Sequence, residues 1–213
     1  MVGFAAADLD KDQSYKLMSS AIVPRPIAWV STVNPEGKRN LAPFSFFNGV
    51  AVMPPTLVFS VAYGDGNRLE KDTYNNIAAT HECVVNIVTD ETAEAMNRSA
   101  TELPADVDEF KFSGVTPTPS VVVKPPRVLE APIQFECTIN QIIRLENDLG
   151  RSDLMICNIV YIHVDDAVYL GEYKVNPQAL HAVGRLGGPN YTRTHDQFTM
   201  TRLPSQVKKP GAS

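Results

Sequence analysis

Hydrophobic and polar residues alternate along the stretch PIQFECTIN at residues 132–140. Successive residues of an extended strand face opposite ways, so the apolar side chains share one face and the polar side chains the other. The pattern therefore predicts a half-buried antiparallel strand. The apolar face comprises Ile133, Phe135, Cys137 and Ile139, and the polar face comprises Gln134, Glu136, Thr138 and Asn140.

Five further stretches are rich in β-branched and aromatic residues and predict strands. The sequence NPEG at 34–37 supplies a turn between the first two of them. At least six strands at short spacing favour a barrel or a sandwich. The five stretches are residues 27–33, 41–52, 55–63, 82–88 and 154–164.

Helices are predicted to be few and short. One runs from about Asp72 to Thr80, and another covers residues 90–98, where acidic residues fill the first turn as the helix dipole prefers. Strands do not alternate regularly with helices, so a doubly wound parallel sheet is not expected. Residues 101–126 contain five prolines and indicate an excursion across the surface instead of a linker. We expect a single domain over residues 1–213 with a flexible C-terminal tail.

The composition narrows the class of protein. The chain of 213 residues has a formal net charge of −5 and 44% hydrophobic residues, which suits a globular domain with a real core. A general nucleic-acid binder would usually present a basic face. No apolar stretch approaches the ~18 residues of a membrane span, and the N-terminus lacks the basic start of a signal peptide. Three widely spaced cysteines, Cys83, Cys137 and Cys157, favour a reducing cytoplasm over a disulfide framework.

Common catalytic and nucleotide-binding motifs are absent from the sequence. GDG at 64–66 is not GxGxxG and no GxxxxGK[ST] occurs, so Rossmann and P-loop phosphate sites are not expected. GRLGG at 184–188 has no serine between its glycines and is not a nucleophile elbow. The four histidines form neither HExxH nor a close ligand pair, so a metal enzyme is not expected.

The stretch NRLEKDTYNNI at 67–77 combines cations with a helix start. Asp72 or Thr73 can cap the helix, which leaves backbone N–H groups and the positive end of the dipole free to meet an anion. Lys71 and Arg68 would add charge, and an arginine can bind a phosphate with two parallel hydrogen bonds. A solvated turn with two surface cations is the alternative interpretation.

The stretch NLAPFSFFNGV at 40–50 does not follow simple strand alternation. Its proline excludes a central position in a sheet ladder. Ser45 and Asn48 could hydrogen-bond along the edge of a planar heterocycle while phenylalanines supply an apolar wall. A phenylalanine-rich core strand with two satisfied polar residues is the alternative.

The stretch VPRPIAWVSTV at 23–33 opens with two prolines that favour an extended approach to a strand. Arg25, between these prolines, is interpreted as an exposed rim residue. Trp29 is the only tryptophan of the chain and is expected in the core.

These stretches, followed in order by PPTLVFSV, KDTYNNI and ECVVNIV, resemble the flavin reductase-like family, which includes the flavoredoxins. The resemblance covers most of the chain, from about residue 14 to about residue 194. It implies a mainly β fold, a six-stranded antiparallel Greek-key split barrel that binds FMN, with short peripheral α-helices. It also implies a homodimer with flavin bound near the subunit interface.

The resemblance assigns roles to individual residues. The KDT stretch is expected at the FMN phosphate with Arg68 as a further partner, and Asp72 is expected to cap the helix or orient Lys71. Arg185 or Tyr191, in HAVGRLGGPNY at 181–191, would border the flavin or its reductant, although a dimer contact explains them equally well. The predicted flavin contacts are Thr32, Val33, Ser45, Phe46, Phe47, Asn48, Arg68, Lys71, Asp72 and Thr73.

The function implied is an NAD(P)H-dependent FMN reductase that could serve a partner monooxygenase. Hydride would pass from the nicotinamide to the flavin, so the protein needs to supply position and electrostatics and no acid–base dyad. The alternative is a flavoredoxin-like electron carrier that retains FMN and passes electrons to a protein partner. A flavoenzyme with an organic substrate of its own and a barrel that binds no flavin are further alternatives. NADH and NADPH are not distinguished by the sequence.

Overall fold

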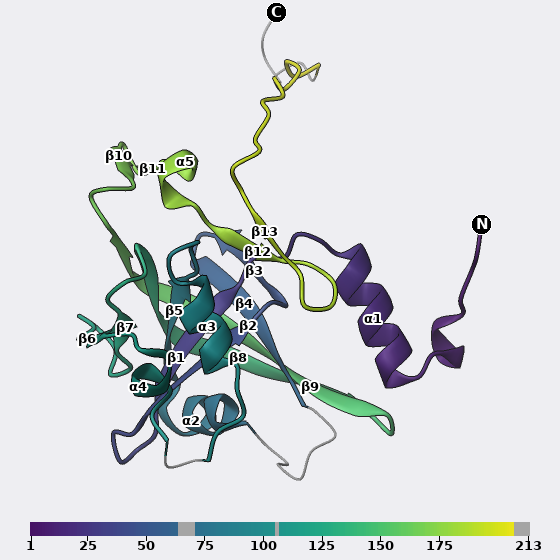
Figure 1. The fold of residues 1–213 in the computed structure, drawn as a ribbon, viewed down its shortest axis with the longest axis horizontal. Helices are drawn as coiled ribbons and strands as arrows, with labels where there is room; N and C mark the ends of the chain where they lie inside the picture. Colours follow the sequence, from purple (N-terminus) through teal and green to yellow (C-terminus); the bar gives the residue numbers. More distant parts are fainter. Residues whose placement is uncertain (64–70, 105–106, 207–213) are drawn as a thin grey trace, which may run out of the picture.

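The centre of the molecule is one antiparallel sheet that curls on itself (Figure 1). A computed structural model describes residues 1–63, 71–104 and 107–206. Within them the sheet has seven strands in the order β2-β1-β5-β8-β9-β4-β3. The strands are β1 (Ala28–Val33), β2 (Arg39–Phe44), β3 (Phe47–Val52), β4 (Pro55–Ala62), β5 (Glu82–Ile87), β8 (Ile133–Asn147) and β9 (Gly150–Val164).

The seventh strand arises where one strand was predicted over residues 41–52. Ser45 and Phe46 are not in strand conformation and interrupt this stretch. The two halves, β2 and β3, are therefore separate strands at opposite ends of the strand order. Only two residues join them, which requires the two ends of the sheet to approach each other. The backbone N–H of Ser60 in β4 donates to the carbonyl of Phe46 and fixes this corner. The predicted count of six strands therefore misses one edge strand.

The strand predicted from alternation is buried on both faces in its first half, whereas Asn140 at its end is exposed. It forms the first part of β8, and the polar side chains Gln134 and Glu136 are 5% and 0% exposed. The proline-rich excursion covers this face, because the backbone N–H groups of Val121, Val122 and Val123 all donate to the Glu136 carboxylate. The prediction of a half-buried strand is therefore wrong at Gln134 and Glu136 and holds at Asn140.

Short helices surround the sheet, as predicted. Helix α2 (Asp72–Thr80) has the predicted bounds, and α3 (Ala93–Ser99) lies within about one turn of its prediction. Helix α1 (Lys11–Ala21) was not predicted; a reciprocal capping box between Asp10 and Gln13 begins it. The remaining short elements are η1 (Ala6–Asp8), α4 (Glu109–Ser113), β6 (Pro117–Thr118), β7 (Arg127–Val128), β10 (Tyr169–Gly171), β11 (Lys174–Val175), α5 (Pro177–Leu180), β12 (Val183–Arg185) and β13 (Tyr191–Arg193).

The core has two parts. One fills the interior of the curled sheet around Phe59, and the other packs α3 and α4 against its outer side around Trp29, which is fully buried as predicted. The three cysteines are free and buried, and the first core cluster contains all of them. No helix within the described ranges is both long and apolar enough to span a membrane.

Candidate functional site

Two buried hydrogen bonds attach helix α2 to the sheet. The amide of Asn40 in β2 donates to the Thr73 hydroxyl, and the amide of Asn76 in α2 donates to the Thr32 hydroxyl, each over 3.0 Å. Thr32 and Asn40 are paired across β1 and β2. The predicted site residues Thr32 and Thr73 are therefore brought together, but their hydroxyls accept these bonds and are buried. Val33 packs in the core beside them.

The start of α2 differs from the predicted cap. Lys71 is the N-cap residue and makes no side-chain capping bond, while Asp72 and Thr73 lie in the first turn. The capping prediction is wrong because Thr73 faces Asn40 inside the protein. The Lys71 ammonium lies 5.9 Å from the centre of the Phe44 ring. Although Lys71 is exposed overall, desolvation of its ammonium lowers its pKa, an effect that Glu102 opposes.

Arg68 lies outside the described residues. The other nine of the ten predicted flavin contacts lie within the described ranges. Phe47 packs against the core and Asn48, the next residue of β3, is exposed and accepts a bond from the Gly49 N–H. Because neighbouring residues of a strand face opposite ways, Phe47 and Asn48 do not share one surface.

Arg25 organises the corner between β2 and β3. It is only 5% exposed, so its interpretation as a rim residue is wrong. Its guanidinium donates to the carbonyls of Ile22 (2.8 Å) and Leu186 (3.1 Å) and to the hydroxyl of Ser45 (3.4 Å). It also lies 5.7 Å from the centre of the Phe46 ring. Ser45 and Phe46 are thus held at one corner by a buried cation.

The same corner includes the predicted residue Arg185. The backbones of Arg25 and Arg185 form a β-bridge. The Arg185 guanidinium stacks at 4.5 Å from the Tyr191 ring centre and donates to the Tyr191 hydroxyl. Arg185 and Tyr191 are therefore bound to each other across the β12–β13 ribbon, close to the corner that holds Ser45.

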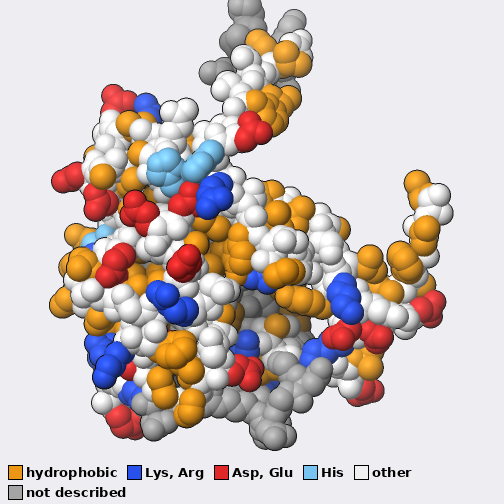
Figure 2. Space-filling view, viewed as in Figure 1, with side chains coloured by type: hydrophobic (Ala, Val, Ile, Leu, Met, Phe, Trp, Pro, Cys, Tyr) orange, Lys and Arg blue, Asp and Glu red, His pale blue; other side chains and the backbone are white. Residues whose placement is uncertain are grey.

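A large hollow of about 1000 Å³ opens between α1 and the sheet. Figure 2 shows this face, where the surface is recessed between the barrel and α1. Among the described residues that line it, Phe46 is the one predicted site residue, alongside Tyr15 and Met18 from α1. Of the α1 residues only Ser19 is buried, so the helix forms an open wall of the hollow.

A buried aspartate holds two arginines at the opposite wall. Asp153 is 0% exposed and accepts from the hydroxyl of Tyr63 (2.7 Å), from Arg151 (2.7 Å) and from Arg144 (3.1 Å). Burial alone would raise the pKa of Asp153, but these hydrogen bonds outweigh burial and lower it. Glu146 also lines this wall and lies 4.0 Å from Arg144, so two arginines face two carboxylates here.

A second, smaller pocket of about 110 Å³ lies at the start of α2. Asn40, Asp72, Asn76 and Glu109 line it together with Arg39, which forms an ion pair with Asp108. The carboxylate oxygen Oε2 of Glu109 is buried and has no hydrogen-bond partner among the residues that the structure describes. Burial raises the pKa of Glu109, and the nearby carboxylates Asp72 and Asp108 raise it further.

Sequence reasoning missed several residues that shape this region. Asn40 and Asn76 lie inside quoted stretches, but no periodic pattern reveals that they bond to Thr73 and Thr32. Arg25 was judged from its neighbouring prolines, whereas its partners come from α1 and from the β12–β13 hairpin. No sequence signal pointed to Asp153.

Comparison with known proteins decides the family. Residues 18–179 match the family described as the flavin reductase like domain. The chain belongs to this family. The resemblance drawn from the sequence is thereby confirmed, and a flavin oxidoreductase is the general class.

Relatives of this family resemble the chain along most of its length. Nitrilotriacetate monooxygenase component B from Bacillus cereus is 35% identical, with a TM-score of 0.88 over 94% of this chain and 98% of that chain. The 2-nitrobenzoate 2-nitroreductase NbaA of Pseudomonas fluorescens is 32% identical, with a TM-score of 0.85 over 99% and 100%. An uncharacterized protein of Aquifex aeolicus is 40% identical over 89% of this chain and 94% of its own length.

A more distant structure supports the split-barrel architecture. A split barrel domain protein from Shewanella frigidimarina has a TM-score of 0.79 at 21% identity, over 96% of this chain and 100% of that chain. This likeness concerns the fold alone. The mainly β split barrel predicted from the sequence is confirmed, with seven strands in its sheet.

Proposed function

We propose that this protein is an NAD(P)H-dependent FMN reductase that delivers reduced flavin to a partner oxygenase. The observation that carries the proposal is the full-length similarity to a monooxygenase component B within a flavin reductase family. Membership of the family supports flavin as the cofactor. FMN, the nicotinamide donor and the oxygenase partner are the parts that we propose.

The larger hollow fits a flavin and the smaller pocket does not. A hollow of about 1000 Å³ has room for a heterocycle with its ribityl chain. Phe46 and Tyr15 offer aromatic surface, and Arg144 and Arg151 offer hydrogen-bond donors, although carboxylates such as Glu146 line the hollow as well. The smaller pocket measures about 110 Å³, which is too small for a flavin, and its lining balances Lys38 and Arg39 against Asp72 and Glu109.

Different residues would bind different parts of the flavin. Phe46 would lie against the ring, and Ser45, whose hydroxyl Arg25 orients, could bond to its polar edge. Lys71 is not among the lining residues of the hollow, and it would attract the phosphate where the ribityl chain extends toward the start of α2. Thr32 and Thr73 would act indirectly by fastening α2. A bound flavin would supply the hydride-accepting chemistry. The protein would hold the nicotinamide against the ring in a reactive geometry.

A second candidate function is reduction of an organic substrate by the bound flavin. NbaA, a 2-nitrobenzoate 2-nitroreductase, matches this chain along its whole length at 32% identity. The electron-carrier alternative has less support, because the flavoredoxin of Desulfovibrio vulgaris is only 18% identical and shares the fold alone.

Anaerobic spectroscopy separates these functions. Protein loaded with one equivalent of FMN is mixed with NADH or NADPH, and loss of the oxidised-flavin absorbance is followed with and without excess free FMN. We expect rapid bleaching and turnover of the excess FMN. Bleaching without turnover of free FMN, followed by oxidation on addition of a nitroaromatic acid, would favour the second function. No bleaching by either donor would refute the reductase proposal.

We further propose a homodimer and a cytoplasmic location. The dimer is supported by apolar side chains that a lone chain leaves exposed, including Val52 and Met53 at 88% and 87%. They follow one another where β3, an edge strand, ends. The location is supported by three free cysteines, since disulfides form in oxidising compartments.

A further inference from the structure

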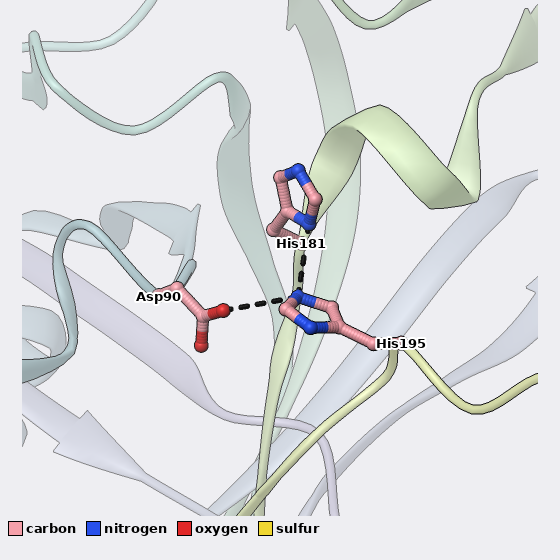
Figure 3. A group of neighbouring side chains, drawn as sticks. All are labelled: Asp90, His181 and His195. Carbon is pink, nitrogen blue, oxygen red and sulfur yellow. Dashed lines mark hydrogen bonds and ion pairs between the residues drawn. The ribbon is translucent and has the colours of Figure 1, made fainter.

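Two histidines and an aspartate that are far apart in sequence meet beside the β12–β13 ribbon (Figure 3). Their potential ligand atoms all lie within 4.8 Å of one another. The Nδ1 atom of His181 is 2.9 Å from the Nε2 atom of His195, and this Nε2 atom is 3.0 Å from Oδ2 of Asp90. Three atoms that carry lone pairs thus converge on one small volume.

Hydrogen bonds alone do not explain both short contacts of the His195 Nε2 atom. The Nε2 atom of His195 carries either one hydrogen or one lone pair, but it faces two neighbours. A single hydrogen cannot make a strong bond to both Asp90 and His181. A cation between the three atoms would use a lone pair from each. We propose that Asp90, His181 and His195 bind a divalent transition-metal ion, with Zn²⁺ the preferred ion.

The distances and the types of ligand suit zinc. Zinc binds imidazole nitrogen and carboxylate oxygen at roughly 2.0–2.2 Å in tetrahedral geometry, which separates neighbouring ligand atoms by roughly 3.3 Å. Two of the observed separations, 2.9 and 3.0 Å, are close to this value. The third, between His181 and Asp90, is at most 4.8 Å and would shorten by side-chain rotation. The side chains of Asp90 and His195 are 24% and 51% exposed, so water can reach the fourth position.

The surrounding structure holds the ligands in place before any metal binds. The backbone N–H of Asp90 donates to the carbonyl of His181 over 3.0 Å, and Thr89 and Ala182 form a β-bridge beside them. Arg193 forms an ion pair with Oδ1 of Asp90 and leaves Oδ2 directed at His195. Partners of this kind orient the ligands in metal sites.

The proposed site would join three segments. Asp90 follows β5, His181 links α5 to β12, and His195 begins the segment that follows β13. Of these segments, the last leaves the body of the protein in Figure 1. The metal would therefore fasten the C-terminal segment to the end of β5. The proposed metal site lies at the open end of the β12–β13 ribbon, whereas Arg185 and Tyr191 lie toward the turn of this ribbon.

The test uses protein without an affinity tag, treated with a chelator and titrated with Zn²⁺ by calorimetry. We expect one ion bound per chain with a Kd near or below the micromolar range. His181→Asn and His195→Gln should each weaken binding by about 100-fold or more, because each removes one of three ligands. Asparagine tolerates the left-handed backbone of His181, whose φ is 48°.

His81→Asn is the matched control. His81 is also exposed and also ends a helix in the left-handed conformation, with φ of 57°, but it lies outside the cluster. This variant should bind Zn²⁺ like the wild type. A wild type that binds no Zn²⁺ at millimolar concentration would overturn the proposal. Binding that survives both His181→Asn and His195→Gln would also overturn it and would direct attention to the buried cysteines.

A second measurement tests the fastening role. Zn²⁺ should slow trypsin cleavage after Arg193 in the wild type and in His81→Asn, because it restrains the adjacent His195. It should leave the cleavage rate of His195→Gln unchanged. Equal protection of all three proteins would contradict the proposed role. Neither measurement depends on flavin binding, so the metal site can fail or hold independently of the reductase activity.

Discussion

At the scale of single residues, the candidate site depends on buried polar side chains whose hydrogen bonds are made within the protein. Arg25 joins α1, the β2–β3 corner and the β12–β13 hairpin through one guanidinium. Asn40 and Asn76 each supply one bond that fixes α2. Such groups position the surfaces that would meet a ligand, while Lys71 and Phe46 would touch it.

Lys71→Ala tests the proposed phosphate contact. Loss of one charge-assisted contact should raise the Kd for FMN by about 10- to 100-fold. Lys38→Ala is the control, because Lys38 lines the smaller pocket and should not alter FMN affinity. Fluorescence titration of FMN measures both. A larger effect of Lys38→Ala would place the phosphate at the smaller pocket instead.

Glu109→Gln tests a buried carboxyl group whose Oε2 has no partner within the described ranges. Its pKa is raised in the folded protein by burial, so ionisation opposes folding. In the unfolded chain the carboxyl group therefore loses its proton at a lower pH than in the folded protein. The free energy of unfolding falls as pH rises from about 4.3 through the folded pKa. At pH 7 the variant should be more stable than the wild type by about 1 kcal/mol.

Urea unfolding at pH 4 and at pH 7 measures this difference for Glu109→Gln. The gain should shrink at the lower pH, where the wild-type carboxyl group is protonated in both states. A variant that is less stable than the wild type at pH 7 would show that the carboxylate has a favourable partner.

At the scale of elements, one carboxylate attaches the proline-rich excursion to β8. Glu136 is fully buried and accepts three backbone N–H bonds and a contact from His163 at 2.6 Å. Burial alone would raise the pKa of Glu136, but these bonds outweigh burial and lower it. The excursion thus covers the polar face of a strand that would otherwise meet water.

Glu136→Gln should destabilise the protein by about 2 kcal/mol at pH 7, because a neutral amide accepts fewer and weaker bonds. The wild-type contribution is present above the unfolded pKa of about 4.3 and is lost as pH falls through the lower folded pKa. The difference between the two proteins should therefore narrow in strong acid.

Urea unfolding and hydrogen exchange at Val121, Val122 and Val123 measure the effect of Glu136→Gln. Glu130→Gln is the control, since this exposed carboxylate accepts a bond from Thr116 in the same excursion. It should change stability by less than about 0.5 kcal/mol. Equal losses in both variants would show that burial of Glu136 adds nothing.

At the scale of the whole molecule, apolar surface argues for a second copy of the chain. Val50 is 56% exposed and precedes Val52 and Met53 at the edge strand β3, while α1 exposes Tyr15 and Met18. Edge strands with exposed apolar residues are usually covered in native proteins.

The double substitution Val52→Glu and Met53→Glu should convert the proposed dimer into monomers, because it buries two charges in the contact. Light scattering measures the mass. Val121→Glu, at a residue that is 62% exposed on the excursion, is the control and should remain dimeric. If flavin binds near the interface, the monomer should also bind FMN more weakly. A monomeric wild type would refute the dimer itself.

The sequence by itself determined most strands of the sheet, helix α2, the family and the class of cofactor, because alternation, turn chemistry and ordered motifs act between residues close in the chain. Only the tertiary structure decided what covers each surface. The polar face of β8, the burial of Arg25 and the Asp90–His181–His195 cluster all depend on segments far apart in sequence. Local patterns report which residues could be buried or could bind, while the folded chain decides which of them meet.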